Sequence, residues 1–285
     1  MSAATILRKV IESKPEGGTA RPGDTLGYIQ PSSLSRGCLL YVARELLKTP
    51  KPELDNQAKR ILESGVASRN RTAKYFADLT AARELPFVDR EYRIRGQCDA
   101  LIYIPPSMSA ERTGFYVVEI KTVKALEYDQ LKHEGQPREE HMLQCLIYIW
   151  GIRRYYRVIS PPGGILYYEN RDTLDYLLFD VEYDEARLTP LLDQVKQVLA
   201  DVRQGRLPEH QQPVEHCSYC AYLEICDVGQ RAVAQRKQEG SAVPDYVLAK
   251  IIAERIVNKK KLQQSKRQAP RSLEELSSQL GWNKD

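Results

Sequence analysis

The stretch that decides the fold is Val117-Val118-Glu119-Ile120-Lys121-Thr122, which reads as a strand with charged residues set into an apolar run. In a strand, residues two apart share a face, so Glu119 and Lys121 point one way while Val118 and Ile120 point the other. A carboxylate and an ammonium group are therefore held side by side next to a buried sheet. An isolated Glu-x-Lys is most often a salt bridge on a solvated face, so its meaning depends on the surrounding sequence.

A second carboxylate stands one strand earlier, in Gln97-Cys98-Asp99-Ala100. If the two strands pair as a hairpin, Asp99 can lie beside Glu119, and the pair offers the hard oxygen ligands that Mg²⁺ or Mn²⁺ prefers. A metal ion held there can polarise a phosphodiester and lower the pKa of a water, while Lys121 orients that water or offsets developing negative charge. The pattern predicts a metal-dependent hydrolytic site.

Periodicity along the chain predicts a domain with both helices and strands. Apolar residues at helical spacing predict helices over residues 33–46, 59–79, 139–153 and 185–203. Strands are predicted over residues 88–95, 97–104, 114–122, 164–169 and 174–183. Outside this body, helical patterns occur at residues 5–13 and 245–261 and from residue 272 onward.

The predicted helix over residues 139–153 has two different sides. His141, Gln144 and Tyr148 lie within about 60° of one another at 100° per residue. The opposite side carries the apolar residues Leu143, Leu146, Ile147 and Trp150. This arrangement predicts a helix that packs by its apolar side and offers an imidazole, an amide and a phenol to a cleft, and the alternative is a plain solvated face.

Taken in order, these features resemble the PD-(D/E)xK nucleases of the RecB exonuclease type over roughly residues 30–228. The motifs that carry the resemblance are a cysteine-containing helix, a glycine-containing helix, Gly96-Gln97-Cys98-Asp99-Ala100, Glu119-Ile120-Lys121 and Gln144-Cys145-Leu146-Ile147-Tyr148. The resemblance implies a restriction-endonuclease-like α/β core, with a mixed sheet of about five strands flanked by helices.

The same resemblance implies a role for each motif residue. Asp99, Glu119 and the backbone carbonyl of Ile120 would bind the catalytic Mg²⁺ or Mn²⁺. Lys121 would assist the attacking water, and Gln144 and Tyr148 would position DNA near the site.

One position departs from the family pattern. The family usually carries a metal-binding His four residues after the helix glycine, and this chain has Arg69 four residues after Gly65. His141 is the nearest candidate for the absent ligand, and a contact with DNA or solvent is the alternative for its side chain. Because the usual metal-binding His is absent, weak nuclease activity, or none, is an open alternative.

The cysteines suggest a second metal centre. Six cysteines without a secretory signal favour metal ligation over disulfides. Cys217, Cys220 and Cys226 form a compact cluster of soft ligands that suits zinc or an iron–sulfur centre. Cys38 is the natural fourth ligand, with His216 as the alternative to it.

Cys98 and Cys145 are instead predicted to be small core residues. One upstream cysteine with three after the core is also the arrangement of the iron–sulfur branch of the RecB-type nucleases. In this respect the chain is similar to the CRISPR-associated Cas-family exonuclease and the AddB nuclease domain. That resemblance implies a 4Fe-4S cluster that staples the N-terminal helix to the segment after the core.

Charge is unevenly distributed along the chain. Residues 231–285 contain 12 basic and six acidic side chains, whereas residues 1–230 contain 30 basic and 32 acidic ones. We therefore predict three parts: an N-terminal arm over residues 1–30, a nuclease domain over residues 31–228 and a basic helical extension over residues 229–285. No apolar run is long enough to span a membrane, which predicts a cytoplasmic protein without a membrane partner.

Together these features predict a metal-dependent DNA exonuclease that acts on single-stranded ends in recombination, repair or CRISPR spacer processing. A helicase, a recombinase or a CRISPR integrase is a possible partner of the basic extension. The alternatives are an endonuclease or flap nuclease on the same scaffold, and a non-catalytic DNA-binding assembly subunit.

Overall fold

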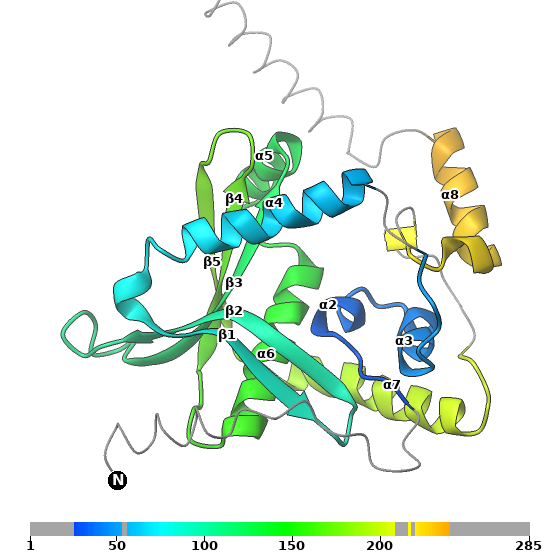
Figure 1. Ribbon diagram of the computed structural model, residues 1–285. Coiled ribbons are helices and arrows are strands. Elements are labelled where there is room, and N and C mark those ends of the chain that lie inside the picture. The colour runs from blue at the N-terminus through cyan, green and yellow to red at the C-terminus, as the bar shows by residue number, and fades with distance from the viewer. Residues whose placement is uncertain (1–25, 53–55, 209–215, 218–219, 240–285) are drawn as a thin grey trace, which may run out of the picture. The chain divides into compact units, whose positions relative to one another are not determined.

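The computed structural model describes residues 26–52, 56–208, 216–217 and 220–239 of the 285-residue chain. Its centre is a five-stranded sheet in the order β1-β2-β3-β4-β5 (Figure 1). The strands are β1 (Thr80–Asp89), β2 (Ile94–Ile104), β3 (Gly114–Val123), β4 (Gly163–Asn170) and β5 (Tyr176–Glu182). This confirms the predicted α/β fold with a sheet of five strands.

The sheet is mixed because the connections between its strands differ. Strands β3 and β4 are parallel, and every other neighbouring pair is antiparallel. A parallel pair needs a long crossover, which α5 (Ala125–Glu134) and α6 (Glu139–Tyr156) supply. The crossover carries α6 back along one face of the sheet.

Helices cover both faces of the sheet. The larger core lies between the sheet and α6, and its members include Phe87, Leu101, Ile147 and Leu188. The other face carries a smaller core, and α4 crosses it (Figure 1). The remaining elements are α2 (Pro31–Leu34), α3 (Leu39–Leu46), α4 (Asn56–Thr72), η1 (Ala77–Leu79), α7 (Glu185–Arg203), η3 (Leu223–Ile225) and α8 (Asp227–Glu239).

The bounds of the first strand and of the end of the helix before it differ from the prediction, although α4 confirms a helix over residues 59–72. We expected a helix over residues 59–79 and a strand over residues 88–95, but α4 ends at Thr72 and β1 spans Thr80–Asp89. Residues 80–85 contain good helix formers, yet they pair with β2, from Thr80 opposite Ile102 to Leu85 opposite Cys98, with a register shift between Thr80 and Ala82. Pairing with a central strand outweighs local helix propensity here.

Two other helices differ from the sequence prediction. The single helix predicted over residues 33–46 is two helices, because Gly37 has a φ of +73° and interrupts the chain between α2 and α3. Helix α5 was not predicted, since Tyr128 and Leu131 are the only residues that it buries and its apolar periodicity is weak.

Some predictions concern residues outside the described part of the chain. The helical patterns at residues 5–13 and 245–261 and from residue 272 onward lie there. None of the helices that the structure describes combines the length and the apolarity needed to span a membrane.

The packing of α6 against β1 yields a testable prediction. A Cβ atom at Gly151 would lie 2.2 Å from Phe87 Cε2, so Gly151→Ala should destabilise the protein by about 1–3 kcal/mol. Gly65, in α4, has no such neighbour, so Gly65→Ala should stabilise the helix by up to about 1 kcal/mol. Urea unfolding of both variants checks the packing, and equal effects in the two variants would contradict it.

Candidate active site

The carboxylates of the Asp99 and Glu119 motifs meet where β2 and β3 separate. The pairing between these strands runs from Ile104 opposite Gly114 to Ala100 opposite Val118. Beyond that point, the amide of Ile120 donates to Asp99 Oδ2 at 2.8 Å. The Asp99 side chain thus takes the place of a strand partner, which holds its carboxylate against the β3 segment that carries Glu119.

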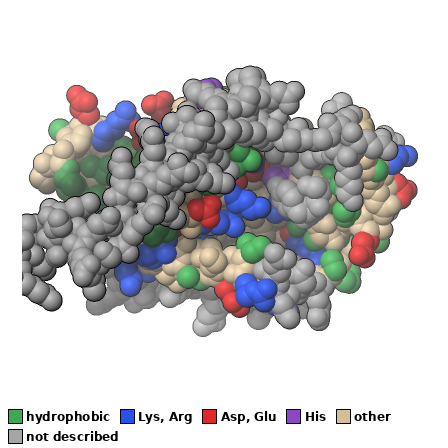
Figure 2. Space-filling view, turned by 90° about the horizontal axis from the view of Figure 1, so that it is seen from above, with side chains coloured by type: hydrophobic (Ala, Val, Ile, Leu, Met, Phe, Trp, Pro, Cys, Tyr) green, Lys and Arg blue, Asp and Glu red, His purple; other side chains and the backbone are tan. Residues whose placement is uncertain are grey.

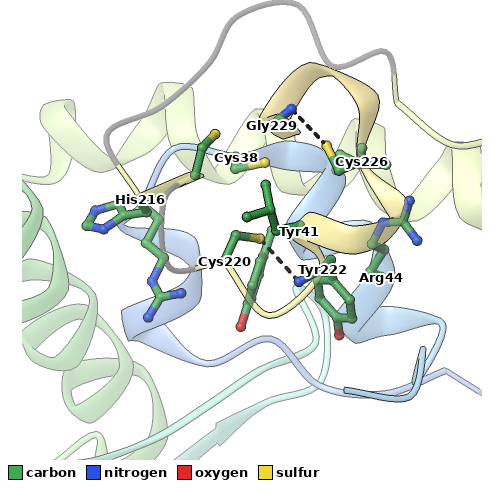
Figure 3. Close-up of a pocket in the computed structure, with 12 residues that line it drawn as sticks. Cys38, Tyr41, Arg44, His216, Cys220, Tyr222, Cys226 and Gly229 are labelled. Atoms are coloured by element: carbon green, nitrogen blue, oxygen red, sulfur yellow. Dashed lines mark hydrogen bonds between the residues drawn. The ribbon is translucent and has the colours of Figure 1, made fainter. Parts of the chain in front are cut away.

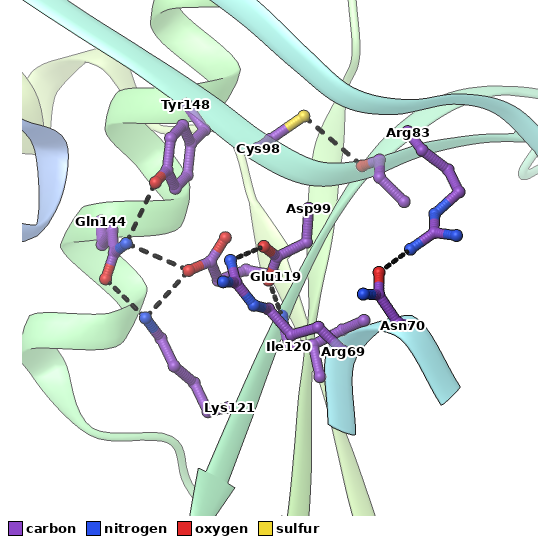
Figure 4. A network of polar contacts seen from close by, with 11 residues as sticks. Arg69, Asn70, Arg83, Cys98, Asp99, Glu119, Ile120, Lys121, Gln144 and Tyr148 are labelled. Atoms are coloured by element: carbon purple, nitrogen blue, oxygen red, sulfur yellow. Dashed lines mark hydrogen bonds and ion pairs between the residues drawn. The ribbon is translucent and has the colours of Figure 1, made fainter. Parts of the chain in front are cut away.

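A hydrogen-bonded network joins β3 to α6 (Figure 4). Lys121 Nζ and Gln144 Nε2 both donate to Glu119 Oε1, at 2.9 and 3.0 Å. Lys121 Nζ also donates to Gln144 Oε1 at 2.7 Å, and Gln144 Nε2 lies 3.2 Å from the Tyr148 hydroxyl. The structure therefore brings together all five residues predicted as catalytic, Asp99, Glu119, Lys121, Gln144 and Tyr148.

The prediction that Gln144 and Tyr148 face an open cleft is wrong. Both are buried, with exposed fractions of 5% and 7%, and the Tyr148 ring packs edge-on against Phe87. Helix α6 is buried on most sides because it lies between the sheet and the helices α2 and α7. Its polar side chains consequently face the carboxylates of the sheet instead of bulk water.

The surroundings of Glu119 disfavour the charged form of its carboxyl group. Burial raises the pKa of its carboxyl to about 7, with Asp99 adding to the rise and Lys121 opposing it. Its second oxygen, Oε2, is buried and has no hydrogen-bond donor among the described residues. A buried acceptor without a donor is costly, so this oxygen is suited to a cation.

Arg69 approaches the same carboxylates from the other side of the sheet. Its Nη1 donates to Asp99 Oδ1 at 2.8 Å (Figure 4). The ion pair joins α4 to β2 and was not predicted, although the sequence marks Arg69 as the departure from the family pattern. A small cavity lies beside it and is lined by Val66, Arg69, Asn70, Ala73, Arg83, Glu84, Asp99 and Ile120.

His141, predicted as a metal ligand, has other partners in the structure. Its Nδ1 lies 2.8 Å from the Tyr168 hydroxyl, and its Nε2 lies 3.4 Å from Glu140 Oε1. Burial, together with the positive charge of Lys121, lowers its pKa to about 3. Its role as a metal ligand stays a prediction, and so does that of the Ile120 carbonyl.

A buried carboxylate that the sequence interpretation missed fastens α4 to the sheet. Glu169, on β4, is only 2% exposed. It accepts hydrogen bonds from Ser68, Arg71 and Thr72, the first two on Oε1 and the third on Oε2. The available signal was a charged residue in an otherwise apolar strand. This contact holds the segment of α4 from which Arg69 extends.

Several basic side chains of the domain are paired with acidic ones. Arg71 pairs with Glu169, and Arg154 pairs with Asp89 and Glu91. On the face seen from above, Lys and Arg side chains lie in several groups beside Asp and Glu side chains (Figure 2). This pairing agrees with the near balance of charge before residue 231.

The four cysteines predicted as cluster ligands line one pocket. Cys38 stands at the N-terminal end of α3, and Cys217, Cys220 and Cys226 come from the segment after α7 (Figure 3). His216 also lines this pocket and pairs with Glu140. The two cysteines predicted as core residues, Cys98 and Cys145, are fully buried elsewhere, which confirms that prediction.

Backbone amides point at two of these sulfur atoms. The amide of Tyr222 donates to Cys220 Sγ and the amide of Gly229 to Cys226 Sγ, both at 3.4 Å (Figure 3). Burial and the neighbouring cysteines raise the pKa of the Cys38 and Cys220 thiols. In the described part of the chain, no three His, Cys, Asp or Glu side chains are arranged to hold a metal ion.

Contacts other than the sulfur atoms also join the cysteine segment to α3. The rings of Tyr41 and Tyr222 pack edge-on with centroids 5.0 Å apart. Arg44 donates to the carbonyl of Ile225, and the Tyr222 hydroxyl donates to the carbonyl of Thr49. The two segments that carry the cysteines are thus held together by protein contacts.

Comparison with known proteins places this geometry in a family. Among solved structures, SSO0001 is 19% identical over 80% of this chain and 98% of its own, with a TM-score of 0.44. The alkaline exonuclease LHK-Exo from Laribacter hongkongensis, in complex with dAMP, is 14% identical over 64% and 90%, with a TM-score of 0.48. A putative exonuclease from Eubacterium rectale is 13% identical over 77% and 92%, with a TM-score of 0.41.

These structural likenesses are too weak to assign a function, and a comparison with curated proteins gave no match. The family comparison is stronger, because the model of the PD-(D/E)XK nuclease superfamily matches residues 27–227. This range covers most of the chain and contains the Asp99, Glu119 and Lys121 motifs. The chain therefore belongs to the PD-(D/E)XK nuclease superfamily.

Proposed function

We propose that this protein is a metal-dependent DNA exonuclease that hydrolyses phosphodiester bonds at single-stranded ends. The observation that carries the proposal is the pair of buried carboxylates, Asp99 and Glu119, with the Lys121 ammonium beside them and Glu119 Oε2 left without a donor. Two acidic ligands and an adjacent cation suit hydrolysis of a phosphodiester.

The residues present fit a divalent cation. Asp99, Glu119 and the carbonyl of Ile120 would hold Mg²⁺ or Mn²⁺, since hard oxygen ligands suit both. When bound, such an ion supplies charge that polarises the phosphodiester. Lys121 then orients the attacking water and offsets negative charge on the phosphate.

Gln144 and Tyr148 act as positioning residues in this proposal. Gln144 contacts both Glu119 and Lys121, so it holds the acid and the ammonium at a set separation. Tyr148 contacts the Gln144 amide nitrogen and keeps the amide plane in place. Both are too buried to bind DNA without a rearrangement, so their effect on DNA passes through Glu119 and Lys121.

Burial of the site favours a single strand as substrate. Glu119 is 4% exposed and lies between helices on opposite faces of the sheet. A phosphate must enter this space to react, and a flexible single-stranded end does so more readily than a continuous duplex. An endonuclease or flap nuclease on the same scaffold would have to admit an internal phosphate.

Cleavage of an end-labelled linear single strand, with Mg²⁺ or Mn²⁺ added in turn, tests the function. We expect mononucleotides or short products with either metal, no cleavage in excess chelator, and no cleavage of a circular single strand. Cutting of the circle would replace the exonuclease with an endonuclease. DNA binding without cleavage at any metal concentration would indicate a non-catalytic assembly subunit instead.

We also propose that Cys38, Cys217, Cys220 and Cys226 hold a 4Fe-4S cluster, which would place the protein in the iron–sulfur branch of these nucleases. Support comes from the shared pocket and from the amides that point at Cys220 and Cys226, since such amides stabilise cluster thiolates. Four thiols that line one pocket suit either zinc or a cluster, and the choice of the cluster rests on the family resemblance.

The proposal extends to the biological setting. Roles in recombination, repair or CRISPR spacer processing, and a helicase, recombinase or integrase partner, rest on the family resemblance. The cytoplasmic location and the division into residues 1–30, 31–228 and 229–285 likewise stay predictions. Nuclease assays with and without residues 240–285 would test whether the basic extension contributes to DNA binding.

A further inference from the structure

Arg69 binds a carboxylate oxygen that a metal ion at the site would also bind. Its guanidinium extends from α4 and is about half exposed, with a side-chain exposed fraction of 43%, whereas the Asp99 side chain that it pairs with is 8% exposed. The Nη1 to Oδ1 distance of 2.8 Å is that of a charge-assisted hydrogen bond. A side chain that reaches in from the solvent therefore covers one oxygen of a nearly buried carboxylate.

Protein donors already serve three of the four carboxylate oxygens. Arg69 donates a hydrogen bond to Asp99 Oδ1, and the Ile120 amide donates one to Asp99 Oδ2. Lys121 and Gln144 both donate to Glu119 Oε1. Two carboxylates are thus matched by two cationic side chains. Without a metal ion, the formal charges of these four groups sum to zero.

We propose that Arg69 is an internal competitor for the divalent cation and sets the metal affinity of the site. The guanidinium must leave Asp99 Oδ1 before that oxygen can bind a metal ion, and a guanidinium that stays nearby repels the ion. This inference rests on the proposed metal site at Asp99 and Glu119, and it assigns to Arg69 a role opposite to that of a ligand.

The surroundings allow the side chain to move while α4 stays in place. Glu169 binds Ser68, Arg71 and Thr72, which fixes the turn of α4 on either side of Arg69. The Arg69 side chain is 43% exposed, so the guanidinium can turn outward into solvent. Competition is therefore a property of the side chain, and substitution of that side chain alone should remove it.

Calorimetric titration with Mn²⁺, without nucleic acid, tests the inference. Arg69→Met should bind Mn²⁺ about tenfold or more tightly than the wild type, because the competing charge is gone. Arg69→Lys keeps a positive charge close to Asp99, so its Mn²⁺ affinity should remain within about threefold of the wild type. Arg83→Met is the matched control: Arg83 lines the same cavity but donates to Asn70 Oδ1, so its removal should leave affinity within about twofold.

Equal or weaker Mn²⁺ binding by a folded Arg69→Met variant would overturn the inference. Circular dichroism and thermal unfolding establish folding, and Arg69→Gln replaces the Met variant if that one does not fold. Cleavage by the wild type separates the two proposals. If it cleaves while Arg69→Met gains no affinity, only the competition is wrong; if neither protein binds metal or cleaves, both proposals fall.

Discussion

Glu119→Gln is expected to reduce DNA cleavage by about 10³-fold or more. The substitution keeps the shape of the side chain and one acceptor for Lys121 and Gln144, but it removes the negative charge that the proposed metal ion needs. Cleavage rates at saturating Mg²⁺ measure the effect. Glu84→Gln is the matched control, because Glu84 lines the cavity beside Asp99 and should be replaceable with little loss.

The same variant should change how stability depends on pH. Burial raises the Glu119 pKa from 4.5 to about 7 in the folded protein, so the wild type binds this proton more tightly when folded than when unfolded. The stabilisation of the folded protein by this proton is fully present below pH 4.5 and is lost as the pH rises through 7. The stability of Glu119→Gln relative to the wild type should therefore rise by about 3 kcal/mol between pH 4.5 and pH 8.

Urea unfolding at pH 5 and pH 8, in chelator, measures this difference between the two proteins. If the difference in the free energy of unfolding between the two proteins is the same at both pH values, Glu119 has an ordinary pKa. Full cleavage activity in both Glu119→Gln and Lys121→Ala would contradict the proposed active site itself.

Cys226→Ser is expected to abolish binding of the proposed cluster and to destabilise the protein by several kcal/mol. Cys226 is buried, accepts from the Gly229 amide, and links the segment before α8 to the pocket that Cys38 lines. Loss of one ligand removes the stabilisation that a structural metal centre gives to the fold. Iron and acid-labile sulfide content of anaerobically purified protein, together with thermal unfolding, measure both effects.

Cys145→Ala is the matched control for metal content, because Cys145 is fully buried outside the pocket. It should lose a little core packing and no iron. A wild-type protein that contains zinc and no iron would overturn the cluster assignment while leaving the four ligands in place. Iron content unchanged in Cys226→Ser would remove Cys226 from the ligand set.

Local sequence patterns explain which elements were predictable. Helix α7 matches its predicted range because its apolar residues repeat at helical spacing. Helix α6 and strand β3 also lie close to their predicted ranges, although both bury runs of consecutive residues and their periodicity is weak. Strand β1 was misplaced because residues 80–85 favour a helix when considered alone, and only β2 makes them a strand. Helix α5 buries too few residues to leave a pattern.

By itself, the sequence determined which chemical groups share an element and a face. The two-residue repeat of β3 places Glu119 with Lys121, and the helical repeat of α6 places Gln144 with Tyr148. Tertiary structure alone decided which groups meet across elements, such as Arg69 with Asp99 and Glu169 with α4. The physical reason is that backbone geometry sets side-chain direction within one element, whereas contacts between elements depend on how distant segments pack.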